Sequence, residues 1–172
     1  QPWLLALDAS PDAPALSGYR VEAGPDLHWQ TDKPVSNLLR YQATAYAAYS
    51  LGPLIASPAL RRYLLLPAGF NPRTVELART LRSDPRLQAA GSAALVEAAL
   101  AQLRNGGYRY TLDPGVYGVH TADEFWFDRK QGYCEHIASA FVVLARAMGI
   151  PARLVTGYQG GAANPVDGVW TV

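Results

Sequence analysis

The sequence contains few of the residues from which metal sites and disulfides are built. Its 172 residues include one cysteine, one methionine and three histidines. A single cysteine excludes a disulfide within the chain, and no group of cysteines and histidines has the spacing of a metal site. The sequence therefore predicts neither a bound metal nor a cofactor, and it leaves the redox compartment open.

Charge and long apolar runs are also scarce. The formal net charge is +1, and no long basic or acidic run gives an electrostatic reason to expect nucleic acid or an anionic membrane as a partner. No run approaches the roughly 20 apolar residues of a membrane span. With 49% hydrophobic residues, the chain can nevertheless bury a substantial core, and we expect it to be soluble and folded.

Both ends of the sequence fall within strand-like runs. The chain starts at Gln1, without a methionine, next to the run Trp3 to Leu7, and it stops at Trp170, Thr171 and Val172. We therefore expect the sequence to be part of a longer protein.

Residues 1–66 are predicted to form a small antiparallel β unit. Its segments are rich in β-prone residues and are separated by proline, glycine and aspartate. In the longest segment, apolar and polar residues alternate as in a strand with one buried face. The predicted strands are Trp3 to Leu7, Tyr19 to Ala23, Leu27 to Gln30, Leu39 to Tyr49 and Tyr63 to Leu66. Nothing in this unit resembles a site, so we interpret it as a brace for its neighbour.

Residues 67–172 are predicted to form a second, helical unit. Pro67, Gly69 and Pro72 mark the boundary, with Asn71 as an expected N-cap. Apolar spacing predicts helices from Pro72 to about Arg82 and from Ser92 to Arg104, and an irregular helical turn at His120 to Phe127. Ala152 to Tyr158 and Gly168 to Val172 are predicted to be strands of a hairpin. Strands followed by helices and a hairpin indicate an α+β fold.

The stretch from Gly132 to Pro151 carries the clearest chemical signal. Apolar residues after Cys134 recur at helical spacing as far as Met148, so we expect a buried helix with Cys134 in its first turn. Unpaired backbone N–H groups and the positive end of the helix dipole favour a thiolate there, as a cysteine nucleophile requires. Gly132 is expected to allow a close approach or an unusual backbone angle. The alternative is an ordinary small core cysteine.

A cysteine nucleophile also needs a base, and the sequence does not identify one. His136 is two positions from Cys134, so the two side chains point about 200° apart on the helix. We expect His136 to support the first turn rather than to reach the thiol. His120 lies in the preceding loop and His28 in the β unit, and neither is a convincing base.

Residues 108–172 resemble the first half of the transglutaminase-like core domain. The runs that carry the resemblance are Asp123 to Asp128, Gly132 to His136, Ala145 to Leu154 and Val155 to Gly161. The whole chain, β unit included, is similar to the external region of bacterial membrane-anchored transglutaminase-like proteins of the TgpA type.

This resemblance implies a papain-like core that stops after the nucleophile helix and the first strands. It also implies a Cys-His-Asp triad in which Cys134 matches the nucleophile. The histidine of the family follows the strand that begins at Trp170, and the aspartate lies one strand later. Both are therefore expected beyond residue 172, and the fragment alone is expected to be inactive.

The implied chemistry is acyl transfer from a glutamine or another amide of a protein or peptide to an amine. The backbone N–H of Cys134 is one expected oxyanion donor, and Tyr108, Tyr110 and Trp126 are candidates for a second donor or for the cleft wall. The resemblance places the region in the periplasm, with membrane contact only through segments outside this chain.

Two alternatives stay open from the sequence. A cysteine peptidase or amidase on the same fold would pass the acyl group to water instead of an amine. A binding or scaffold module would keep the fold without the chemistry. The physiological substrate and the oligomeric state do not follow from the sequence.

Overall fold

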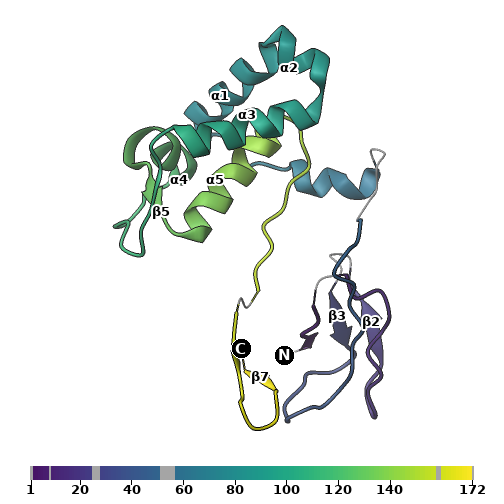
Figure 1. Ribbon diagram of the computed structural model, residues 1–172. Helices are drawn as coiled ribbons and strands as arrows, with labels where there is room; N and C mark the ends of the chain where they lie inside the picture. Colours follow the sequence, from purple (N-terminus) through teal and green to yellow (C-terminus); the bar gives the residue numbers. More distant parts are fainter. Residues whose placement is uncertain (1, 8, 25–27, 51–56, 158–159, 172) are drawn as a thin grey trace. The chain divides into compact units, whose positions relative to one another are not determined.

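The computed structural model describes residues 2–7, 9–24, 28–50, 57–157 and 160–171 (Figure 1). The chain divides into two compact units, residues 1–55 and 56–172. The boundary predicted from the sequence lies at residue 66.

The first unit contains one small antiparallel sheet. Its strands are β1 (Trp3–Leu4), β2 (Val21–Ala23) and β3 (Trp29–Thr31). The order is β1-β3-β2, with β3 antiparallel to both of its neighbours. The first three predicted strands therefore overlap real ones, although each real strand is shorter; residue 27 lies outside the described residues.

The fourth predicted strand, Leu39 to Tyr49, is wrong: residues 39–49 form no strand. Alternation alone does not make a strand, because its backbone N–H and C=O groups need a neighbouring strand to bond with. This segment is instead attached at single points. The hydroxyl of Tyr41 donates to the carbonyl of Leu5, and the N–H of Tyr46 donates to the carbonyl of Ala9.

The second unit is built mainly of helices (Figure 1). In chain order its helices are η1 (Pro58–Leu64, a 3-10 helix), α1 (Pro72–Ser83), α2 (Pro85–Ala90), α3 (Ser92–Asn105), α4 (Thr121–Asp123), η2 (Glu124–Arg129, a π-helix) and α5 (Cys134–Ala147). Its strands are β4 (Arg109–Tyr110), β5 (Gln131–Gly132), β6 (Ala162–Ala163) and β7 (Trp170–Thr171). β4 and β5 pair in parallel, and β6 and β7 form an antiparallel hairpin.

The predicted helices at 72–82 and 92–104 are confirmed, but α2 was missed. Asp84 and Pro85 follow directly after the end of α1. They also start a new helix, because the Asp84 carboxylate accepts from the N–H of Arg86 at 2.8 Å and Pro85 occupies the first helical position. One short motif thus both ends a helix and begins the next.

Two further predicted strands are wrong. The first two residues of the predicted strand Tyr63 to Leu66 belong to η1, and the other two form no strand. The sequence favours η1 because Ser57 accepts from the N–H of Ala59 and Pro58 follows it. Residues 152–157 form no strand and are mostly exposed, and Tyr158 lies outside the described residues. The predicted return strand at 168–172 overlaps β7, which pairs with β6 instead.

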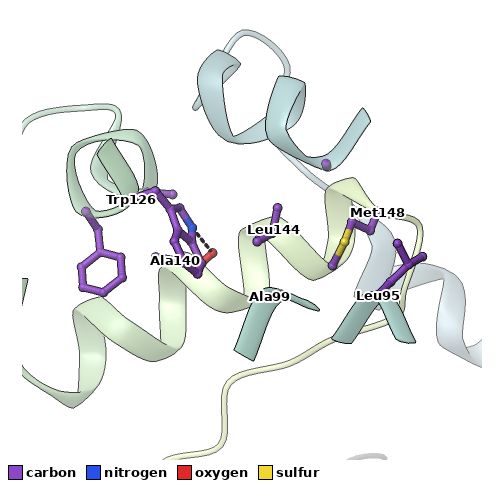
Figure 2. Packing of buried hydrophobic residues seen from close by; sticks show 9 residues of the cluster. Leu95, Ala99, Trp126, Ala140, Leu144 and Met148 are labelled. Atoms are coloured by element: carbon purple, nitrogen blue, oxygen red, sulfur yellow. Dashed lines mark hydrogen bonds between the residues drawn. The ribbon is translucent and has the colours of Figure 1, made fainter. Parts of the chain in front are cut away.

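The core of the second unit lies around α5, as the predicted apolar stripe required. Leu144 and Met148 are buried, and Ile137 and Phe141 pack against the same cluster. Figure 2 shows Leu144 and Met148 beside Leu95 and Ala99 of α3. The buried cluster comprises Ala78, Leu95, Ala99, Ala122, Phe125, Trp126, Ala140, Leu144 and Met148. Burying a leucine side chain stabilises a fold by about 2 kcal/mol, so this cluster fixes α5 firmly.

The start of α1 and α4 cap each other across some 50 residues of sequence. Asn71 occupies the predicted N-cap position, but its side chain accepts from the N–H groups of Ala122 and Asp123 instead of capping α1. The buried Asp123 carboxylate in turn accepts from the N–H of Arg73 at 3.0 Å and from that of Thr74 at 2.7 Å. A carboxylate at a helix N-terminus also complements the helix dipole. This exchange locks α1 to the segment that precedes β5.

Among the described helices, none combines the length and the apolar character that crossing a bilayer would need.

Candidate active site

The candidate site is the junction between β5 and α5. Gly132 ends β5 in register with Tyr110 of β4, and Tyr133 follows in extended conformation at the N-cap position. Cys134 is the first residue of α5 and is exposed. The predicted position of Cys134 in the first turn is therefore confirmed. The side chain of Tyr133 makes no capping hydrogen bond to α5, so among the described residues no side-chain cap occupies the first N–H groups of this helix.

Gly132 is required by a close approach, as expected. A Cβ atom built on Gly132 would lie 2.6 Å from Cβ and 3.0 Å from Cγ of His136. Such distances do not occur between real side chains, so any other residue here would displace the helix start. Glycine is required here by the lack of space for a side chain and not by an unusual backbone angle, because the φ angle of Gly132 is not in the left-handed region.

His136 is enclosed by aromatic rings. Its ring centroid lies 4.5 Å from that of Tyr117 and 4.3 Å from that of Tyr133. Its Nδ1 atom is buried and has no hydrogen-bond partner among the described residues. This environment agrees with the expectation that His136 supports the first turn.

The other two histidines have partners elsewhere. Nδ1 of His120 accepts from the N–H of Asn71 at 3.1 Å, which makes this ring part of the contact between α1 and α4. His28 belongs to the first unit, where its ring meets Trp3 and its Nε2 meets the side chain of Gln30. Within the described residues, no hydrogen bond joins a histidine to Cys134.

Of the three candidate oxyanion or cleft residues, Trp126 lies in the core and Tyr108 packs against it. Trp126 is 1% exposed, and its indole N–H donates to the carbonyl of Ala140 in α5 at 3.1 Å (Figure 2). The hydroxyl of Tyr108 donates to the carbonyl of Trp126 at 2.9 Å, and its ring stacks on Phe125. Burial raises the pKa of Tyr108, against a smaller lowering by a hydrogen bond with Gln102. Both donors are thus already engaged.

Tyr110 differs from these two because it is 63% exposed. Its side chain makes no hydrogen bond within the part of the chain that the structure describes. Its register with Gly132 places it one strand away from the residues that lead into Cys134. The oxyanion role remains a prediction for all three residues, and Tyr110 has the freest donor.

The loop between β4 and α4 was not singled out by the sequence, yet it contacts the site. Tyr117 lies on this loop, and its hydroxyl donates to the carbonyl of Gln131. Arg129 of η2 donates to the carbonyls of Pro114 and Val116, at 3.1 and 2.6 Å. The loop is therefore fixed to η2 on one side and to β5 on the other.

Charged groups of η2 complete this attachment. Arg129 pairs with Glu124 at 3.1 Å, and Glu124 accepts from the N–H of Gly118 at 2.7 Å. The guanidinium of Arg129 lies 4.7 Å from the ring centroid of Tyr117. Burial raises the pKa of Tyr117, and Glu124 adds to this rise while Arg129 opposes it. A π-helix is rare and is often found next to functional sites.

Within the described ranges, no three side chains of histidine, cysteine, aspartate or glutamate gather as a metal site would need. The chemistry available here is that of an exposed cysteine at the start of a helix whose apolar side packs into the core, beside a loop held by hydrogen bonds.

An α+β fold with a cysteine at the start of its central helix is the arrangement of papain-like proteins, and the comparisons agree with this class. The family model described as "Transglutaminase-like superfamily" matches residues 84–171. The chain belongs to this superfamily. The match includes β5, Cys134 and the whole of α5.

Similar proteins are known from two bacteria. The chain is 38% identical over 166 residues to a protein-glutamine gamma-glutamyltransferase of Pseudomonas aeruginosa, with 96% of this chain and 24% of that protein covered. It is 56% identical over 39 residues to the uncharacterized protein YebA of Bacillus subtilis, which covers 23% of this chain and 5% of that protein. The chain thus spans about a quarter of the length of the first relative.

Solved structures of the periplasmic domain of TgpA from Pseudomonas aeruginosa are also similar. The structure bound to ethylmercury matches with a TM-score of 0.83 and 38% identity, covering 96% of this chain and 56% of that one. A second structure of the same domain matches with a TM-score of 0.81 and 36% identity, covering 99% of this chain and 56% of that one. The papain-like α+β fold predicted from the sequence is confirmed.

Proposed function

We propose that this chain is the nucleophile-bearing part of a protein-glutamine acyltransferase in which Cys134 forms a thioester with the substrate. The observation that carries the proposal is the exposed Cys134 on the first residue of a 14-residue helix whose apolar side packs into the core. The 38% identity to a protein-glutamine gamma-glutamyltransferase supports the same reaction.

The reaction proceeds in two steps. The sulfur of Cys134, its proton taken by a base, attacks the γ-carboxamide carbon of a glutamine. The C–N bond breaks, ammonia leaves with that proton, and a thioester remains. An amine then attacks the thioester carbon, the C–S bond breaks, and a new amide forms while the thiol is restored.

The N–H groups at the start of α5 suit the charge that develops on the substrate oxygen in both steps. The backbone N–H of Cys134 is the first proposed oxyanion donor, because backbone donors at a helix start need no rearrangement during the reaction. Tyr110 is the best of the three candidates for a second donor, since Tyr108 and Trp126 already donate to carbonyl groups. Tyr108 and Trp126 are then proposed as part of the cleft wall.

His136 is not the proposed base. Its ring is packed between Tyr117 and Tyr133, and its Nδ1 is enclosed. We propose that the histidine and aspartate of the triad follow residue 172, as the sequence resemblance predicts.

The proposed substrates are protein or peptide chains that supply a glutamine as acyl donor and an amine as acceptor. The proposed location is the periplasm, because the similar solved structures are periplasmic domains.

The test uses the protein in the full length that its gene encodes. A glutamine peptide and a primary amine are incubated with it, and products are identified by mass spectrometry. Transamidation that is lost in Cys134→Ala supports the proposal. Conversion of glutamine to glutamate without amine incorporation would indicate the amidase alternative, and no conversion of any amide would indicate a scaffold.

A further inference from the structure

Each of the three residues that lead into Cys134 is held by the side chain of Tyr117 or His136. The hydroxyl of Tyr117 donates to the carbonyl of Gln131. Gly132 lies so close to His136 that no Cβ fits between them. The ring of Tyr133 meets the ring of His136 edge to face at 4.3 Å. The position of the thiol therefore depends on these two rings.

The two rings belong to a longer column of stacked groups. The guanidinium of Arg129 lies over Tyr117, Tyr117 lies against His136, and His136 meets Tyr133. Arg129 is itself fixed by Glu124 and by the carbonyls of Pro114 and Val116. The column thus connects η2 to the residue just before Cys134, through aromatic and cation contacts of a kind that stabilises folded proteins.

The ring of His136 acts by its shape and not by a hydrogen bond. Its Nδ1 is shielded from solvent and has no partner among the described residues. A buried nitrogen without a hydrogen-bond partner destabilises a folded protein, so an apolar ring of similar size should be accepted at this position at least as well.

We infer that Tyr117 and His136 are positioning residues that hold the Gln131 to Tyr133 segment, and through it Cys134, in the geometry needed for attack on the substrate. The catalytic part of this inference rests on the proposed function, in which Cys134 attacks the substrate. A displacement of about 1 Å at a reacting group can lower a rate by about 10²-fold. Because the two residues act through their ring contacts, a substitution that keeps the ring should lower the rate less than one that removes it.

The experiment compares paired variants of the full-length protein by steady-state kinetics with a glutamine peptide and an amine. We expect His136→Ala and Tyr117→Ala each to lower kcat by about 10²-fold while KM changes by less than about threefold. His136→Phe and Tyr117→Phe keep the rings, so each should retain kcat within about fivefold of the parent. Phe70→Ala is the matched control, because it removes a ring contact with a histidine, His120, outside this column.

Equal loss in His136→Phe and His136→Ala would overturn the inference, since the nitrogen atoms would then be the active feature. Equal loss in Phe70→Ala would overturn it as well, because any lost ring contact would suffice. The alkylation rate of Cys134 by iodoacetamide separates this inference from the proposed function, because it needs no amide substrate. We expect His136→Ala to slow the alkylation of Cys134 several-fold and His136→Phe to leave its rate unchanged. If His136→Ala merely frayed the start of α5, Cys134 would be alkylated as fast as in the parent protein or faster.

Discussion

The two compact units of the chain differ in what holds them together. The first unit has strands of two or three residues, and Leu4 is the only buried leucine, isoleucine or valine among its described residues. The second unit has nine buried residues packed in one cluster around α5. The position of Cys134 is therefore determined by the hydrophobic core around α5 and by the stacked groups from Arg129 to Tyr133. The first unit relies instead on a few hydrogen bonds between segments without regular secondary structure.

The largest expected effect on stability follows from removing a side chain at the centre of the core of the second unit. Leu144→Ala should destabilise the second unit by about 3–5 kcal/mol, because Leu144 is fully buried and its removal leaves a cavity. Hydrogen exchange detected by mass spectrometry measures the effect, since it reports on peptides of each unit separately.

Leu4→Ala is the counterpart in the first unit. We expect a smaller loss there and no change in exchange across α5. If Leu4→Ala accelerated exchange in α5 as much as Leu144→Ala does, the two units would share one cooperative core and the comparison would fail.

The next largest effect concerns the crossed caps of α1 and α4. Asp123→Ala should cost about 2–3 kcal/mol, because the buried carboxylate holds the N–H groups of Arg73 and Thr74 together with the Thr74 hydroxyl. Asp128→Ala is the matched control, since its pair with Arg73 is half-exposed and should contribute less than about 1 kcal/mol. Urea unfolding gives both values, and similar losses for the two variants would refute the capping role.

A third effect tests the close approach at the site. Gly132→Ala should cost about 1–3 kcal/mol, because its Cβ would overlap His136 and shift the start of α5. Gly157→Ala is the control: among the described residues, no atom beyond its chain neighbours lies within 4 Å of the added Cβ, and φ is not in the left-handed region. The control should be neutral or slightly stabilising. Thermal unfolding measures both, and a neutral Gly132→Ala would remove the steric argument.

The smallest expected effect is a dependence of stability on alkaline pH. Burial raises the pKa of Tyr108 above that of the unfolded chain, which is about 10. The unfolded chain therefore loses this proton first as pH rises, so the contribution of Tyr108 is complete below about pH 10 and declines above it. Urea midpoints from pH 8 to 11 should fall less steeply for Tyr108→Phe than for the parent. Parallel curves would show that Tyr108 does not titrate in this way.

Local signals in the sequence were enough to predict most helices and the candidate nucleophile. These signals influence only the residues next to them in the sequence. Examples are Pro72 at a helix start, the apolar spacing through Leu144, and Gly132 before Cys134. These features appear in the structure where the sequence placed them.

What the sequence did not predict depends on residues far apart along the chain. The alternating residues 39–49 resemble a strand, but no neighbouring strand pairs with them, and spacing cannot reveal that. Asp123 caps a helix that begins 50 residues earlier. The contact between Tyr117 and His136 likewise joins a loop to a helix, so neither the loop nor Arg129 could be recognised as part of the site from local pattern alone.

The central claim is that Cys134 is an acyl-accepting nucleophile. The most direct measurement is intact-mass spectrometry of the full-length protein, quenched in acid after mixing with a glutamine peptide in the absence of amine. The account predicts an adduct equal to the peptide less ammonia, located on the fragment that contains Cys134 and absent from Cys134→Ala. Unchanged turnover of the peptide by Cys134→Ala would contradict it.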